Sequence, residues 1–104
     1  MDIALPFDFR YAPEQLLQRC GYAGYTDINT GQTSFSRTLA TRGNYPRFHV
    51  YVEVQENLPV LRLHIDQKKP VYAGAHAHNA EYDGEVVARE AERIKSVLTN
   101  LHQA

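Results

Sequence analysis

The sequence predicts an α+β fold in which an antiparallel sheet of three or four strands packs two helices on one face, in the order α-β-β-β-α. Two neighbouring segments, 47–55 and 60–67, alternate apolar and polar residues with the period of two that is typical of β-strands. A third segment, 84–101, carries an apolar stripe at helical spacing. The chain has 104 residues, 43% of them hydrophobic, which is enough for a single domain, 1–104, with its own core.

The N-terminal part is predicted to contain an extended segment and a short helix. Apolar and aromatic residues alternate over residues 1–11, which indicates an extended lead-in, and Pro6 restricts it to the edge of a sheet. Residues 13–20 are predicted to form a helix, because Pro13 suits a first helical turn and Gly21 suits a C-terminal stop.

The rest of the chain supplies the sheet and the second helix. Residues 21–32 are rich in turn-forming residues and are expected to hold little regular structure. Residues 33–39 are predicted to form a strand on their β-branched and aromatic content, and strands 47–55 and 60–67 follow as one hairpin. The helix 84–101 is expected to face the core with Val87, Ala91, Ile94, Val97, Leu98 and Leu101.

The register of the hairpin follows from the need to bury one face. If the apolar side chains share a face, the predicted pairs are Gln55–Val60, Glu53–Arg62, Tyr51–His64 and His49–Asp66. A slip by one residue would place apolar side chains opposite polar ones. In the predicted register His49 and His64 are diagonal neighbours, with Cβ atoms about 7–8 Å apart.

Composition excludes several classes of protein. Cys20 is the single cysteine, so an intrachain disulfide and a cysteine-based zinc finger are excluded, and its place in the predicted helix indicates a small buried thiol. The formal net charge of −1 points to no particular partner. The sequence shows no signal peptide and no apolar stretch of membrane-spanning length, so a cytoplasmic location without a membrane partner is expected.

Four of the five histidines lie between residues 45 and 84 and are predicted to converge on one polar or metal site. His49 and His64 share the polar face of the hairpin, next to Asp66, by the alternation of the two strands. Another interpretation remains open, in which His49 only forms a hydrogen bond with Asp66 that stabilises the hairpin.

The other two histidines, His76 and His78, precede the last helix. If this segment is extended, both imidazoles point the same way, with Cα atoms about 6.6 Å apart, and both could bind one metal ion. Convergence requires the connector 68–83 to lie back across the polar sheet face. If the connector swings away, His76 and His78 are loop residues bonded to water or backbone.

Imidazole and carboxylate ligands without a thiolate fit Zn²⁺, Mn²⁺, Fe²⁺ or Ni²⁺. A site of this kind could activate water for hydrolysis, with Glu81 or Asp66 as the catalytic base. Arg47, Arg62 and Tyr51 are the candidates for binding an anionic substrate. Without a metal, the histidines could still perform general acid–base catalysis near neutral pH.

The alternative function is a nucleic-acid- or protein-binding module that uses the basic region 37–69 and the sheet face. The predicted order of elements resembles that of double-stranded-RNA-binding domains, whose last helix opens with lysines that contact phosphates. Here that helix opens with Asp83-Gly84-Glu85, which would repel phosphate. A basic patch could instead be formed by Arg42, Arg47, Lys68 and Lys69, with Tyr45 as a stacking group. The same face could also join copies of the chain in a homo-oligomer.

Three segments resemble those of a family of small, uncharacterised bacterial proteins. They are residues 44–49 (NYPRFH), 63–70 (LHIDQKKP) and 76–84 (HAHNAEYDG), and the resemblance covers roughly residues 35–95. No activity is established for that family. The resemblance therefore implies a natural single-domain protein and assigns no catalytic role.

Overall fold

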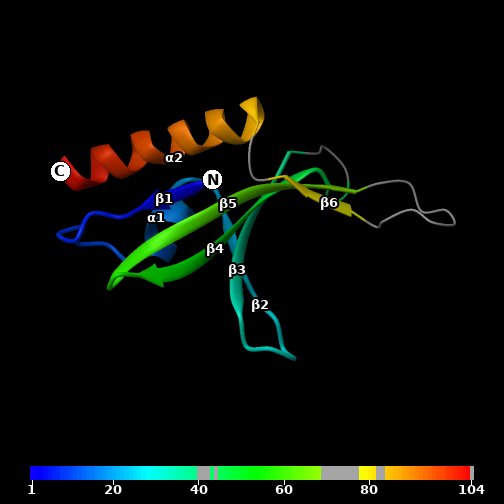
Figure 1. Cartoon of the computed structure of the whole chain (residues 1–104), viewed down its shortest axis with the longest axis horizontal. Helices are drawn as coiled ribbons and strands as arrows, with labels where there is room; N and C mark the ends of the chain where they lie inside the picture. The colour runs from blue at the N-terminus through cyan, green and yellow to red at the C-terminus, as the bar shows by residue number, and fades with distance from the viewer. Residues whose placement is uncertain (40–42, 44, 69–77, 82–83, 104) are drawn as a thin grey trace, which may run out of the picture.

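The computed structural model describes residues 1–39, 43, 45–68, 78–81 and 84–103, with the backbone alone for Lys68 and residues 78–81 (Figure 1). The elements in chain order are β1 (Asp2–Ala4), α1 (Pro13–Arg19), β2 (Ala23–Thr26), β3 (Thr33–Thr38), β4 (Arg47–Gln55), β5 (Leu58–Lys68), β6 (His78–Glu81) and α2 (Glu85–Gln103). The predicted α+β class is confirmed. Neither helix in these ranges is both long and apolar enough to cross a membrane.

The described strands form one antiparallel sheet. Five of them follow the order β1-β5-β4-β3-β2, and β6 also pairs with β5. β1 lies beside residues 60–62 of β5, and β6 lies beside residues 65–68. The predicted number of strands, three or four, and the predicted order α-β-β-β-α are wrong, because the described residues also form the short strands β1, β2 and β6.

β2 is an edge strand within a stretch that composition predicted to be irregular. It pairs over its whole length, Ala23 to Thr26, with β3. The turn that follows is closed by Asp27, whose Oδ1 accepts hydrogen bonds from the backbone N–H groups of Asn29 (2.7 Å) and Thr30 (3.2 Å). All four residues of β2 are exposed, so the strand carries no apolar face that alternation could reveal.

The β4–β5 hairpin has the predicted faces but a different register. Its turn is Glu56-Asn57, both with positive φ (52° and 67°), which is typical of a two-residue type I′ turn. β5 therefore begins at Leu58. The observed pairs are Gln55–Leu58, Glu53–Val60, Tyr51–Arg62, His49–His64 and Arg47–Asp66. The predicted pairs were wrong by two residues, and a shift of two leaves every side chain on its predicted face.

Replacing Glu56 with asparagine is expected to stabilise the protein. A left-handed backbone costs an L-residue about 1–2 kcal/mol, and asparagine tolerates that conformation better than glutamate. We expect the free energy of unfolding to rise by about 0.5 kcal/mol in a urea titration. Asn57→Ala is the matched control, because it places an intolerant residue at the other positive-φ position and should lower the same free energy. A destabilised Glu56→Asn variant would contradict the assigned turn.

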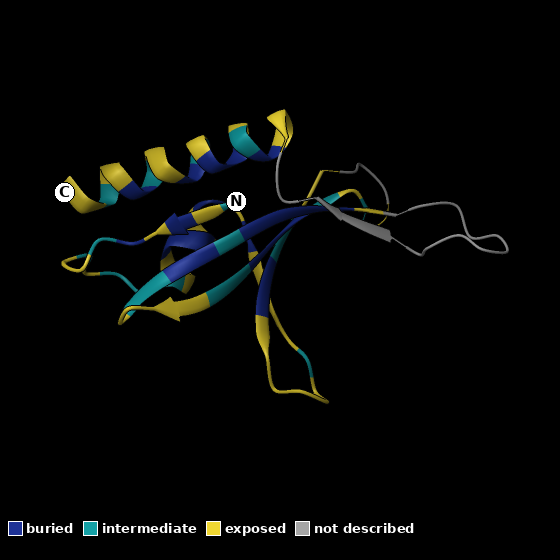
Figure 2. Ribbon diagram, viewed as in Figure 1, coloured by how far each residue is buried: buried dark blue, intermediate teal, exposed yellow. Residues whose placement is uncertain are grey.

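Both helices pack on the apolar face of the sheet, as predicted. The buried strand residues are Phe48, Val50, Leu61, Leu63 and Ile65. They form one core with Leu16 and Leu17 of α1 and with Val87, Ala91, Ile94 and Leu98 of α2. Figure 2 shows the buried positions of α2 along the side that faces the sheet. Cys20 belongs to the same core, and burial raises the pKa of its thiol, which agrees with the predicted structural role.

A buried carboxylate connects α2 to the rest of this core. Glu90 is 5% exposed, and its Oε2 accepts a hydrogen bond of 2.6 Å from the hydroxyl of Tyr22. Arg93 donates to both oxygens of Glu90, at 2.8 and 2.9 Å, and to the carbonyl of Cys20 at 2.6 Å. Arg37 of β3 approaches the same carboxylate at 3.5 Å. The network joins α2 to the end of α1 and to β3.

Candidate functional site

The candidate site lies on the sheet face opposite the helices. His49 of β4 stands directly opposite His64 of β5, and Arg47 stands opposite Asp66. Because side chains of a strand alternate between faces, His64 and Asp66 lie on the same side, and paired residues of neighbouring strands share it. These four polar side chains, two from each strand, therefore lie next to one another on the same face of the sheet.

Three of these side chains bring donor atoms together. His64 Nε2 lies 2.9 Å from Asp66 Oδ1, and His49 Nδ1 lies 3.5 Å from Asp66 Oδ2. His49 Nδ1 and His64 Nε2 are 3.3 Å apart. We call these residues, His49, His64 and Asp66, the His-His-Asp group. They satisfy the spacing of a group that could hold a metal ion.

The His-His-Asp group is buried, although it lies on the polar face. Exposed fractions are 9% for His49, 3% for His64 and 4% for Asp66. Further along the same face of β4, Glu53 and Gln55 are exposed. Buried ionisable side chains are costly unless they are paired or bind a metal. The burial of these three residues therefore distinguishes this end of the polar face from the exposed end.

Burial also determines the charge state of one imidazole. Removal from water lowers the pKa of His64, and the nearby Asp66 carboxylate opposes this effect without cancelling it. The net direction is downward from the ordinary value near 6.5. His64 is therefore neutral at pH 7, and neutral imidazole is the form that binds metals.

Tyr51 restrains the orientation of both histidine rings. Its ring stacks against His64, with centroids 5.7 Å apart and planes inclined by 13°. The His49 ring meets Tyr51 edge-on, with centroids 4.6 Å apart. Tyr51 was predicted to bind substrate, and the structure places it in contact with both imidazoles. The rings consequently have little freedom to leave the positions in which their nitrogens face Asp66.

The two arginines predicted to bind an anion have different surroundings. Arg47 Nε lies 3.8 Å from Asp66 Oδ2, and its guanidinium carbon lies 4.9 Å from the centre of the Tyr45 ring. Arg62 instead pairs with Asp2 at 3.3 Å and with Glu53 at 3.6 Å. Arg47 therefore lies beside the His-His-Asp group, whereas Arg62 forms surface ion pairs.

The second half of the predicted histidine cluster is His76 and His78, with Glu81 as the associated base. His76 lies outside the described residues. His78 and Glu81 are described by their backbone, which pairs with β5 opposite Lys68 and Ile65. The convergence of four histidines and the role of Glu81 as a base therefore stay predictions. The remaining histidine, His102, forms a surface pair with Asp8 at 2.9 Å.

The separations within the His-His-Asp group suit a metal ion. Two donors bound at about 2.1 Å with angles near 90–110° lie about 3.0–3.4 Å apart. The observed separations run from 2.9 to 3.5 Å, with His64 nearest to Oδ1 of Asp66 and His49 nearest to Oδ2. Two imidazoles and one carboxylate form the donor set of several catalytic zinc and non-haem iron sites, which keep further positions for water or substrate.

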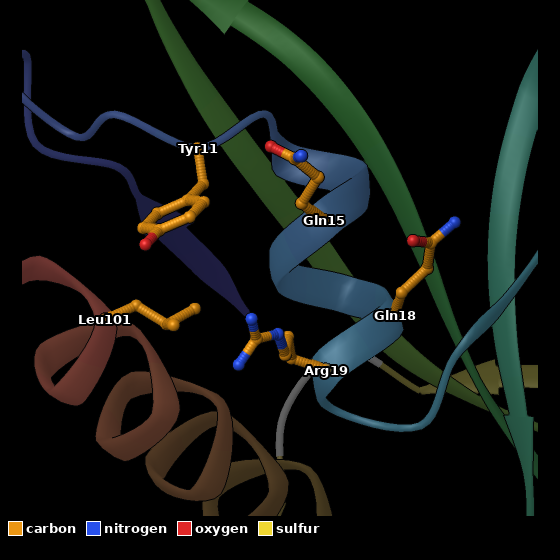
Figure 3. A pocket seen from close by; sticks show the side chains of 5 residues that line it. All are labelled: Tyr11, Gln15, Gln18, Arg19 and Leu101. Atoms are coloured by element: carbon orange, nitrogen blue, oxygen red, sulfur yellow. The ribbon is translucent and has the colours of Figure 1, made fainter.

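Two pockets are relevant to ligand binding. One, of about 220 Å³, adjoins His49 and is lined by residues of β4, β3 and the β2–β3 turn, including Gln32 and Ser34. None of these residues was predicted from the sequence, although the alternation in 33–39 would have placed Ser34 and Ser36 on the polar face. The other, of about 300 Å³, lies between α1 and α2 and is lined by Tyr11, Gln15, Gln18, Arg19 and Leu101 (Figure 3).

Comparisons with protein-family models, with curated proteins and with solved structures gave no match. The resemblance to small bacterial proteins in residues 44–49, 63–70 and 76–84 therefore stays a prediction, as does the cytoplasmic location. The arguments for function rest on the geometry of the His-His-Asp group and its surroundings.

Proposed function

We propose that the protein binds one divalent metal ion through His49, His64 and Asp66, and that the bound ion supports hydrolysis of a small substrate. The observation that carries this proposal is the placement of two imidazole nitrogens beside the two oxygens of one carboxylate, all on buried residues of two paired strands. The nitrogen–oxygen and nitrogen–nitrogen separations are 2.9–3.5 Å. Strand pairing fixes the backbone of all three residues, so the donors are arranged before a metal arrives.

The donor set defines the metal class. Two nitrogens and one carboxylate oxygen, without thiolate, fit Zn²⁺, Mn²⁺, Fe²⁺ or Ni²⁺. An ion of this class with three protein ligands keeps an open position and lowers the pKa of bound water. In this arrangement Asp66 is a ligand, so the role of base passes to another group. Tyr51 acts as a positioning residue that holds both imidazoles.

A metal-free network is the competing explanation. A hydrogen bond from His64 to Asp66, with His49 beside it, would satisfy the same buried groups and would only stabilise the hairpin. The two explanations differ in what happens when a metal is added, because a ligand that binds the folded state alone stabilises it.

Metal titration of protein prepared without a histidine tag and treated with a chelator tests the proposal. We expect one ion per chain by elemental analysis after reloading with Zn²⁺, Mn²⁺, Fe²⁺ or Ni²⁺. At 100 times the dissociation constant, binding adds about 2.7 kcal/mol, which should raise the thermal midpoint by about 10 °C or more. If all four ions leave both the metal content and the midpoint unchanged, the group is a structural network.

The nucleic-acid-binding alternative gains no specific support. Of the predicted basic patch, Arg42 and Lys69 lie outside the described residues and Lys68 is described by its backbone alone. Arg47 lies over Tyr45 and close to Asp66, beside the His-His-Asp group. The observed strand order also differs from the topology on which that resemblance depended.

A further inference from the structure

A pocket of about 220 Å³ opens beside the His-His-Asp group. Its lining comes from β2 and the turn that follows it and from the strands β3 and β4: Tyr25, Asp27, Thr30, Gln32, Ser34, Arg47, His49 and Tyr51. His49 is therefore both a wall of the pocket and one of the three proposed metal ligands. A molecule in the pocket would lie next to the metal centre.

Arg47 gives one end of the pocket an anion-binding group. Its Nε is buried and has no hydrogen-bond partner among the described residues. The nearest carboxylate oxygen, on Asp66, is 3.8 Å from it, which is too far for a hydrogen bond. A buried donor without a partner is costly. The Arg47 side chain is 30% exposed, so the rest of its planar guanidinium is accessible, and it matches a carboxylate or a phosphate group.

The other walls are polar and mostly uncharged. Hydroxyl groups come from Thr30, Ser34 and Tyr51, and Gln32 adds an amide. Groups of this kind exchange hydrogen bonds with hydroxyl groups of a ligand. Asp27 adds a further acceptor, although its Oδ1 already accepts two backbone hydrogen bonds in the turn. The lining thus favours a ligand that combines one anionic group with hydroxyl groups.

The volume limits the size of this ligand. Pockets for drug-sized molecules are about 300–1,000 Å³, and this one holds about 220 Å³. At about 30 Å³ for each water, the space is equivalent to roughly seven waters. The pocket therefore has room for a compound of a few carbon atoms, and a nucleotide or a peptide would extend beyond it.

We propose that this pocket binds a small hydroxylated anion, with its carboxylate or phosphate group on Arg47 and its hydroxyl groups on the β2–β3 side. We further propose that the pocket is the substrate site of the metal centre, and this second part rests on the proposed function. The anion-binding part does not depend on the metal, because Arg47 and the hydroxyl groups belong to the protein itself.

The pocket between the two helices is one internal competitor for an anion, and a pocket of about 240 Å³ lined in part by Arg89 and Arg93 of α2 is another. Figure 3 shows the Arg19 side chain directed toward the space between Tyr11 and Leu101, so this pocket also offers a guanidinium. None of the residues that line it belongs to the His-His-Asp group, so a ligand there would not take part in the proposed chemistry. An experiment must therefore report where the anion binds as well as whether it binds.

Amide chemical shifts of metal-free protein, titrated with three probes, give this location. The probes are glycerate, glycerol 3-phosphate and glycerol, which carry a carboxylate, a phosphate and no charge, respectively. We expect at least one of the two anions, and not glycerol, to shift the amides of Thr30, Gln32, Ser34 and His49. Shifts confined to Gln15, Gln18 and Arg19, or no shift with either anion at millimolar concentration, would overturn the proposal.

Arg47→Gln and Arg62→Gln form a matched pair of variants. Both arginines lie on the same sheet face, but Arg62 is paired with Asp2 and Glu53 and lies outside the pocket. We expect Arg47→Gln to weaken binding of the anion about tenfold or more, since hydrogen bonds to charged groups are among the stronger ones. Arg62→Gln should change the affinity less than twofold. Equal affinities of the two variants, with spectra that show both folded, would contradict the role of Arg47.

The two proposals fail separately in these measurements. Anion binding by the metal-free protein, combined with no metal uptake, would retain the anion site and reject the metal centre. Metal uptake without amide shifts on addition of the anions would retain the metal centre and reject the anion site. If both are retained, the anion should alter the affinity for the metal, and no change in that affinity would reject the pocket as the substrate site of the metal centre.

Discussion

His64→Ala is expected to lower the affinity for a divalent metal more than about 100-fold. Loss even of a residue that only supports a ligand typically costs 10–100-fold in metal affinity, and His64 is proposed to be a ligand itself. It is also the donor closest to Asp66, at 2.9 Å, and its lowered pKa keeps it in the metal-binding form at pH 7. Isothermal titration with the metal identified by elemental analysis measures the change.

Two further variants make this result specific. His102→Ala removes a histidine that pairs with Asp8 at the surface, away from the His-His-Asp group, and should leave the metal affinity unchanged. Asp66→Asn keeps the shape of a ligand while removing its charge, and should weaken binding in a folded protein even if His64→Ala is destabilised. Unchanged affinity in both His64→Ala and Asp66→Asn would refute the metal centre.

The sequence was sufficient to predict which residues share the face of the candidate site. Alternation in the two central strands placed His49, His64 and Asp66 on one side, and this depends only on the period of two in a strand. Alternation could not predict the register, that is, which residues of the two strands stand opposite each other. Glutamate is uncommon with positive φ, so Glu56-Asn57 did not stand out as a two-residue turn.

Two other features escaped prediction for different physical reasons. The walls of the pocket beside His49 come from the β2–β3 turn region, and an exposed edge strand leaves no periodic signal. Glu90 lies on the core-facing side of an otherwise apolar helical stripe, where periodicity cannot predict a buried charge. Its partners, Tyr22 and Arg93, are 68 and 3 residues away in sequence, and only the packing of α2 against α1 brings all of them together.

Glu90→Ala is expected to lower the free energy of unfolding by about 3 kcal/mol. Breaking a buried ion pair from one side typically costs 3–5 kcal/mol, and the lower end applies because the partners Arg37 and Arg93 can still contact water. The buried Tyr22 hydroxyl would also lose its acceptor at 2.6 Å. Glu92→Ala is the matched control on the same helix, since its side chain is 75% exposed and its pair with Lys95 should contribute less than about 0.5 kcal/mol.

The pH dependence of stability tests the same carboxylate without removing its volume. Burial raises the pKa of Glu90, but the hydrogen bonds from Arg93 and Tyr22 and the charges of Arg93 and Arg37 lower it by more, so the net direction is downward. A carboxyl whose pKa is lowered on folding stabilises the protein above its unfolded pKa of about 4.3 and loses that contribution as the pH falls through the folded value.

Wild type and Glu90→Gln should therefore differ most near neutral pH and converge as the pH falls below about 4. His64, whose pKa is also lowered, destabilises both proteins below about pH 6.5, so its effect cancels in the difference between them. Urea titrations across this range measure that difference. A difference that stays constant from pH 7 to pH 3 would mean that the charge of Glu90 does not stabilise the junction between α2, α1 and β3.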